Sequence, residues 1–278
     1  MPLRAKMNTP RGADGFGAAI ADRFSREGCK VIILDLNQVK GESKQRADSN
    51  ITFLPGDVTR PETWEKALEL AQTNYGRIDV VVNNAEPTLR SDLLTRPKLG
   101  ITHDPSPIHT KSLREYERTF NVNVKPVFIS AQIFAPVMMQ QGHGIFINIT
   151  RLWYEVIDRK STGCTRPRPG FAIYNASKAA VEVATKTMAL EYAPAVRFNC
   201  ISPAVGNTAM PPLTRSRLQA SIGNGEDSRQ RLRQVEDMLP MKRLCQPLDI
   251  ANAAWYLGSE QSSFVTGTTL EVDGGRGV

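Results

Sequence analysis

Short runs of apolar residues alternate with longer stretches of helical spacing along most of the chain. Each run holds four to six residues rich in Val, Ile and Leu, without the polar alternation of a strand that has one wet face. Such runs are typical of strands buried on both faces, so the pattern predicts a parallel sheet covered by helices on both sides, a doubly wound α/β fold. The runs lie at residues 31–34, 51–54, 78–82, 145–149, 196–201 and 269–272.

The segments between these runs carry apolar residues at helical spacing. Gly28, Gly76 and Gly142 follow three of the segments, at the place where a left-handed residue commonly ends a helix. Residues 86–111 and 203–240 are polar and rich in proline, and we expect long substrate loops there. The length of 278 residues predicts a single domain, residues 1–278. Helices are expected at residues 17–27, 62–75, 113–141, 174–192 and 248–257.

Composition and charge exclude several classes of protein. No apolar run approaches the roughly eighteen residues that would span a bilayer, and no secretory segment is evident, so we expect a soluble cytoplasmic protein without membrane contact. The net charge of +7 is scattered among acidic residues, which argues against a nucleic-acid partner. The four cysteines lie far apart, and no metal site is expected.

A glycine-rich turn leads directly into the first predicted helix. It contains Gly12, Gly15, Phe16 and Gly17, and the small size of the glycines lets backbone N–H groups approach a pyrophosphate. Asp35 ends the run at residues 31–34, where a carboxylate can bind both ribose hydroxyls of an adenosine. The pattern predicts a Rossmann-type nucleotide site that favours NAD(H).

A 2′-phosphate beside Asp35 would meet like-charge repulsion, which Lys40 or Arg11 could soften, so NADP(H) stays possible. Two further groups follow buried strands and can line the nucleotide. Asp57 and Val58 are placed to reach the adenine, and the segment Asn83, Asn84 and Ala85 is placed at a ribose.

Tyr174 and Lys178 stand four residues apart at the start of a predicted helix, so they share one helical face. A phenol with a reference pKa of about 10 exchanges protons poorly at neutral pH unless a nearby cation favours its anion. Lys178 is placed to supply that charge.

These motifs, with Asn123, Ser202-Pro203 and the Val272-Asp273-Gly274-Gly275 segment, strongly resemble the short-chain dehydrogenase/reductase family, over the chain from about Arg11 onward. The segments 166–170 and 205–208 look most like a fungal branch with many secondary-metabolism reductases. The resemblance implies an NAD(P)-dependent oxidoreductase that interconverts a secondary alcohol and a ketone. The substrate would be a small, hydrophobic metabolite, and the enzyme would form a homodimer or homotetramer.

By this resemblance, Tyr174 is the general acid/base and Lys178 lowers its pKa and binds the nicotinamide ribose. Asn123 would hold a water that relays protons to Lys178, and Val205 and Thr208 would contact the nicotinamide amide. Ser161 would hydrogen-bond the reacting carbonyl.

An apparent insert at residues 151–160 precedes Ser161, which leaves Thr150 as an alternative source of that hydroxyl.

The N-terminus departs from the family pattern. Residues 1–9 should form an apolar central strand, yet they include Arg4 and Lys6, and Pro10-Arg11 replace a Thr-Gly pair. The first strand is therefore expected to be degenerate or missing. Glu86 also replaces an expected glycine. These departures motivate an alternative function, a catalytically impaired nucleotide-binding or scaffold protein.

Overall fold

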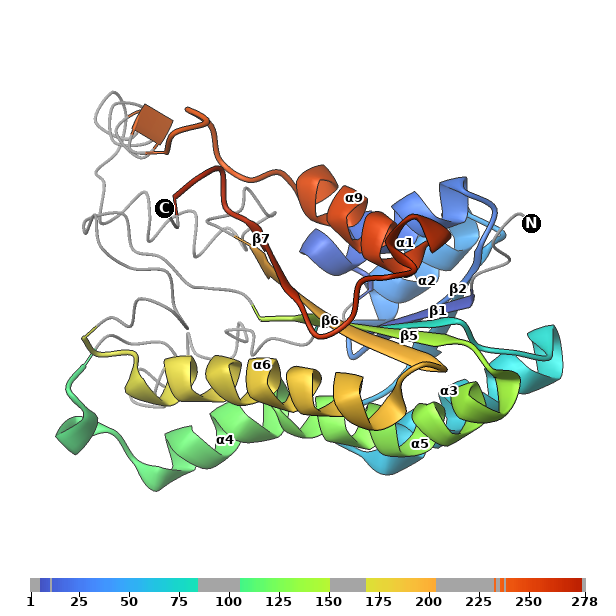
Figure 1. Ribbon diagram of the computed structural model, residues 1–278, viewed down its shortest axis with the longest axis horizontal. Coiled ribbons are helices and arrows are strands. Elements are labelled where there is room, and N and C mark those ends of the chain that lie inside the picture. The colour runs from blue at the N-terminus through green and yellow to red at the C-terminus, as the bar shows by residue number, and fades with distance from the viewer. Residues whose placement is uncertain are drawn as a thin grey trace.

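Seven strands pair in parallel in the order β3-β2-β1-β4-β5-β6-β7 within the part of the chain that the structure describes (Figure 1). This computed structural model describes residues 6–10 (backbone only), 12–84, 106–150, 169–203, 233, 236–237 and 239–276. The predicted doubly wound α/β fold is confirmed, and each predicted apolar run forms a strand. The strands are β1 (Lys6–Pro10), β2 (Lys30–Asp35), β3 (Ile51–Pro55), β4 (Val80–Asn83), β5 (Gly144–Ile149), β6 (Val196–Pro203) and β7 (Thr269–Val272).

The first strand, expected to be degenerate or missing, is present, so the second of these alternatives is wrong. Strand β1 lies in the middle of the sheet, in register with β2 over all five of its residues and with β4 at Met7 and Asn8. Parallel pairing uses main-chain groups, which every residue except proline supplies in full, so an unusual side-chain pattern does not prevent it. A missing first strand therefore gives no support to the alternative of a catalytically impaired protein.

Helices cover both faces of the sheet. Figure 1 shows α1, α2 and α9 on one side and α3, α4, α5 and α6 on the other. Helix α2 was not predicted, because it buries only Gly41 and has little apolar periodicity. The helices are α1 (Gly15–Arg26), α2 (Gln38–Ala47), α3 (Pro61–Tyr75), α4 (Leu113–Asn123), α5 (Lys125–Gln141), α6 (Ala172–Tyr192) and α9 (Pro247–Gly258), with short 3₁₀ turns η2 (Ile108–Thr110) and η3 (Glu260–Ser262).

The helix predicted at residues 113–141 is two helices. Helix α4 ends at Asn123 and α5 begins at Lys125, with Val124 between them. Pro126 lacks an N–H and its ring crowds the carbonyl four residues earlier, so a continuous helix is disfavoured at this point. The break places Asn123 at a helix end, where its side chain meets α6.

The combined segment Leu113–Gln141 is the one stretch of the described residues long and apolar enough to cross a membrane. Its most apolar window is 56% buried inside the protein. Helix α5 packs on the sheet and on α3, as the core helix of a soluble protein does.

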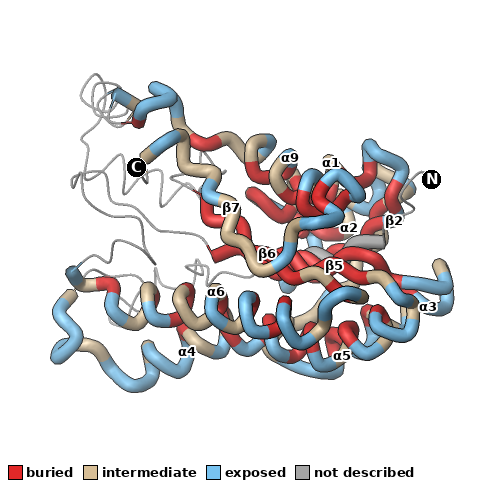
Figure 2. The backbone as a smooth tube through the Cα atoms, in the orientation of Figure 1, coloured by how far each residue is buried: buried red, intermediate tan, exposed pale blue. Residues whose placement is uncertain are grey.

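Alternate residues of the central strands feed two separate cores. Val31 and Ile33 face α1 and α9, whereas Ile32 and Leu34 face the core under α3 and α5. Figure 2 shows the buried strands as the red centre of the molecule, with exposed residues on the outer faces of the helices. The expectation of strands buried on both faces is confirmed for β2, β4, β5 and β6, whereas β3 and β7, at the two ends of the strand order, are only partly buried.

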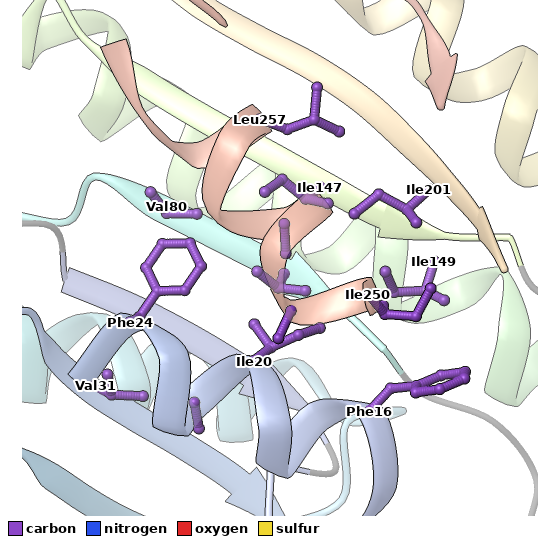
Figure 3. Close-up of a cluster of buried hydrophobic side chains, with 14 of the residues drawn as sticks. Phe16, Ile20, Phe24, Val31, Val80, Ile147, Ile149, Ile201, Ile250 and Leu257 are labelled. Carbon is purple, nitrogen blue, oxygen red and sulfur yellow. The ribbon is translucent and has the colours of Figure 1, made fainter. Parts of the chain in front are cut away.

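Helices α1 and α9 make a close contact over the first of these cores. Phe24 is fully buried beneath α9, and its ring meets the Trp255 ring edge-to-face at a centroid distance of 5.2 Å. Figure 3 shows Phe24 and Ile20 of α1 beside Ile250 and Leu257 of α9.

Gly258 is needed for this contact, because a Cβ there would lie 2.7 Å from Cζ of Phe24. We expect Gly258→Ala to lower the free energy of unfolding by about 1–3 kcal/mol through overpacking. Urea denaturation of the variant would measure this. The double variant Gly258→Ala, Phe24→Leu should lose less unfolding free energy than the sum of the losses in the two single variants, because the smaller side chain makes room for the methyl group. Strict additivity would contradict the proposed clash.

Candidate active site

The predicted site residues that the structure describes gather at the carboxyl ends of the strands. Asp35 closes β2, Asn83 closes β4, and Thr150 follows β5. In an open parallel sheet this is the edge at which ligands bind, and β1 and β4 mark the point where the strand order reverses.

The glycine turn begins helix α1 as predicted. Gly12 and Gly17 are buried, and Gly15 has a φ of +57°, a left-handed conformation that favours glycine. Asp14 caps the helix by accepting a hydrogen bond from the Gly15 N–H at 2.9 Å, and it forms an ion pair with Lys40 of α2. The N-terminus of α1 therefore faces the strand ends, where its dipole favours an anion.

Asp35 connects the end of β2 to this turn. Its carboxylate accepts hydrogen bonds from the Ala13 N–H at 3.3 Å and from the Asn37 N–H at 2.9 Å. The side chain remains half-buried, so it lies beside the glycine turn and still reaches solvent.

Asp57 and Val58 lie just beyond β3. Asp57 accepts hydrogen bonds from the Thr59 N–H and hydroxyl, and the carbonyl of Val58 accepts one from Nε1 of the buried Trp64 at 2.8 Å. These contacts hold the turn rigidly at the same sheet edge as Asp35. Their predicted contact with an adenine stays a prediction.

Asn83 is buried, and its side chain belongs to a polar network inside the protein. Its Nδ2 donates to Ser130 Oγ at 3.0 Å and to Asn148 Oδ1 at 2.8 Å, and Asn148 Nδ2 donates to Thr185 Oγ1 at 2.8 Å. A contact between Asn83 and a nucleotide would therefore have to come from its main chain. The half-buried Asn84 is the next residue along.

The same network ends at Cys200 of β6, whose Sγ lies 3.2 Å from Thr185 Oγ1. Burial raises the pKa of the Cys200 thiol to about 12, so it is a neutral packing group and not a nucleophile.

Tyr174 and Lys178 lie in the first turns of α6, as predicted. Both side chains are 2% exposed, and Lys178 Nζ stands 5.8 Å from the centroid of the Tyr174 ring. Nζ also donates a hydrogen bond to the Ile149 carbonyl at 3.3 Å, which ties the lysine to the end of β5. The phenol and the ammonium are thus close together, buried, and held at the ligand-binding edge of the sheet.

Asn123 reaches the same helix from α4. Its Nδ2 donates to Ser177 Oγ at 3.0 Å, and that hydroxyl donates to the Tyr174 carbonyl at 2.7 Å. Asn123 Oδ1 is buried and has no hydrogen-bond partner among the residues that the structure describes. A buried acceptor left unpaired costs about 1–3 kcal/mol, so this oxygen is suited to a donor such as a water molecule.

Sequence reasoning did not single out Ser177. The signal was its place three residues after Tyr174, on the face of α6 that carries both Tyr174 and Lys178.

Five predicted positions fall outside the described residues: Arg11, Ala85, Ser161, Val205 and Thr208. The anomalies at Arg4, Glu86 and residues 151–160 fall outside them too.

Thr150, the alternative to Ser161, is described and fully buried. Its hydroxyl donates to the Ile201 carbonyl at 3.3 Å, so its proton is already engaged within the protein.

The described residues fit a nicotinamide dinucleotide. The helix N-terminus with its left-handed Gly15 suits a pyrophosphate, and the half-buried Asp35 beside it suits the hydroxyls of an adenosine ribose. Tyr174 and Lys178 lie at the end of β5 on the same edge, and Asn123 is joined to their helix through Ser177.

Comparison with known proteins agrees with this geometry. A family model described as enoyl-(acyl carrier protein) reductase matches residues 12–276, nearly the whole chain. The 4-formylbenzenesulfonate dehydrogenase of Comamonas testosteroni is 35% identical over 272 residues, covering 96% of this chain and 95% of the relative. The chain belongs to the short-chain dehydrogenase/reductase family. It is therefore an oxidoreductase that acts on CH–OH groups.

Two further members show the range of the family. The 2,5-dichloro-2,5-cyclohexadiene-1,4-diol dehydrogenase of Sphingobium indicum is 32% identical, covering 96% of this chain and 94% of the relative. The crystal structure of 3-ketoacyl-(acyl-carrier-protein) reductase from Brucella melitensis, complexed with NADH, superposes with a TM-score of 0.76 at 29% identity, covering 99% of this chain and 98% of that one. These short-chain dehydrogenase/reductases are bacterial, so the comparisons do not support the expected likeness to a fungal branch.

Proposed function

We propose that this short-chain dehydrogenase/reductase interconverts a secondary alcohol and a ketone on a small hydrophobic molecule, with NAD(H) as the preferred cofactor. The observation that carries the proposal is the buried pairing of Tyr174 with Lys178 at the carboxyl end of β5. When bound, the nicotinamide supplies or accepts the hydride. The residues of this chain have to bind the cofactor, orient the substrate carbonyl and transfer one proton.

Tyr174 is the group in this cluster suited to exchange that proton with the substrate oxygen. The ammonium of Lys178 lies beside its ring, and a cation near a phenol favours the phenolate. Ser161 remains the proposed donor to the carbonyl, since the hydroxyl of Thr150 is engaged by Ile201. Val205 and Thr208 remain the proposed contacts of the nicotinamide amide.

Two observations support the preference for NAD(H). Asp35 presents a half-buried carboxylate beside the glycine turn, where the phosphate of NADP(H) would meet like charge. Lys40, one of the two cations expected to soften this repulsion, is paired with Asp14. Its charge is therefore already partly neutralised.

The relatives suggest which substrates to test first. The names of both bacterial dehydrogenases place the reacting oxygen on, or next to, a six-membered carbon ring. We therefore propose ring-borne alcohols, aldehydes and ketones as the first panel. A role in secondary metabolism and a cytoplasmic location stay predictions.

We also propose a homo-oligomer. Val183 and Leu190 stand two turns apart on α6 and are 63% and 84% exposed, and the exposed Phe128 lies on the neighbouring α5. Apolar side chains gathered on one face of a helical layer are typical of an interface between subunits.

Replacing Tyr174 by Phe removes the proton-carrying oxygen and keeps the ring. We expect kcat to fall by about 10²–10⁴-fold, with little change in the dissociation constant of NADH measured by fluorescence titration. Tyr192→Phe, the same change at the far end of α6, serves as the control and should leave kcat intact. Turnover by Tyr174→Phe at the parental rate would contradict the assignment.

Asp35→Asn removes the charge and keeps one of the two acceptor oxygens. The ratio of NADPH to NADH dissociation constants should fall by about tenfold, because the repulsion of the 2′-phosphate is relieved. Parallel fluorescence titrations with NADH and NADPH measure this ratio. Glu42→Gln on α2 removes the same charge away from the turn and should leave the ratio unchanged; equal effects of both variants would argue against a specific role for Asp35.

Light scattering with size-exclusion chromatography should give a mass that is a multiple of 30.7 kDa. The double variant Val183→Glu, Leu190→Glu should shift the protein toward the monomer, since charges would be buried in the interface. Val39→Glu, at a 76% exposed position on α2 across the sheet, is the control. A parental protein that elutes as a monomer would refute the proposed assembly.

A further inference from the structure

We infer that Ser177 is a positioning residue for the proton path of this enzyme. It holds Nδ2 of the Asn123 amide, and it thereby fixes the direction in which the buried Oδ1 of the same amide points. The inference rests on the proposed function and deepens it. Ser177 lies on α6, one residue before Lys178 and three after Tyr174. It is fully buried and contacts Asn123 of α4.

A serine hydroxyl has one hydrogen to donate and lone pairs to accept with. Ser177 donates that hydrogen to the Tyr174 carbonyl, at 2.7 Å. Toward Asn123 it can therefore only accept, so the amide must turn its NH₂ group to Ser177, and it does so at 3.0 Å. The orientation of the Asn123 amide is thus set by the hydrogen bond that Ser177 makes to the backbone of the general acid/base.

The consequence lies at the other end of the amide. With Nδ2 bound to Ser177, Oδ1 must face the opposite side, where it is buried and no described residue pairs with it. This fixes a hydrogen-bond acceptor at that position. An acceptor there can receive a hydrogen from a water molecule or an ammonium, whereas a flipped amide would present N–H groups, which repel an ammonium and can only donate to water.

Helix geometry makes this arrangement rigid. Asn123 is the last residue of α4, at the break before Pro126, and α4 packs along α6 (Figure 1). Ser177 shares a helical face with Tyr174 and Lys178. The Asn123–Ser177 hydrogen bond therefore joins the broken helix to the part of α6 that carries the chemistry.

The chain offers a matched control in Ser130 of α5. This serine is also fully buried, donates to the carbonyl three residues earlier (Val127, 3.1 Å), and accepts from an asparagine Nδ2 (Asn83) at 3.0 Å. Its asparagine is buried in the core network, where Nδ2 also donates to Asn148 Oδ1 at 2.8 Å. Ser130→Ala thus removes a buried serine hydroxyl with the same kinds of hydrogen bond, and it leaves the contact between Ser177 and Asn123 in place.

The experiment compares Ser177→Ala, Ser177→Thr and Ser130→Ala for unfolding free energy, NADH dissociation constant, kcat and the solvent deuterium isotope effect on kcat. We expect Ser177→Ala to lower kcat by about tenfold and to raise the isotope effect, because the proton path is no longer held in place. Its NADH dissociation constant should stay within about twofold of the parent, and Ser177→Thr, which restores the hydroxyl, should recover kcat. Ser130→Ala should lose comparable stability with no change in the isotope effect.

Two results would overturn the inference. The first is a parental kcat and isotope effect in Ser177→Ala. The second is a lowered kcat and a raised isotope effect in Ser130→Ala as well, which would make the effect a general cost of losing a buried serine. If Ser177→Ala does not fold, Ser177→Cys keeps the size of the side chain but accepts hydrogen bonds poorly, and it carries the same expectations. Failure of this inference is separable from failure of the proposed function. Loss of turnover in Tyr174→Phe with parental behaviour of Ser177→Ala refutes only the role of Ser177.

Discussion

The arrangement of this site depends on how helix α6 is held against strand β5. Two successive residues at the end of the strand make polar contacts to the helix: Asn148 donates to Thr185, and the carbonyl of Ile149 accepts from Lys178. Apolar packing alone is non-directional and would tolerate small shifts of a helix along a sheet. Hydrogen bonds are directional and short, so these two contacts determine where Tyr174 and Lys178 stand relative to the strand end.

Polar groups in a core are acceptable only when they are paired. The network from Ser130 and Asn83 through Asn148 to Thr185 pairs its members across β4, α5, β5 and α6, and it ends at a thiol that burial keeps neutral. The cluster around Asn123 differs in one respect, because it leaves one acceptor unpaired. That contrast separates a network that stabilises the fold from a cluster built to accept something further.

Much of this was predictable from the sequence. Continuous apolar runs identified six strands, of which β2, β4, β5 and β6 are largely buried on both faces and β3 and β7 only in part. The spacing of Tyr174 and Lys178 identified their shared face. Helix α2 could not be found in this way, since a helix that buries only a glycine has no apolar stripe to read. The break after Asn123 was overlooked because its cause, Pro126, sits within an otherwise regular apolar pattern. Ser177 was missed because its role comes from a contact with a residue 54 positions away, which periodicity does not reveal.

The order of the strands has a consequence for how the chain assembles during synthesis. Strands β2 and β3 add outward from β1 on one side, then β4, β5, β6 and β7 add outward on the other. Each newly made strand thus joins an open edge of the existing sheet, and none has to insert between two strands already paired. The pairing of β1 with β4 is the one junction between the two halves in the described sheet, so β1 must keep one edge free until residues 80–83 have been synthesised.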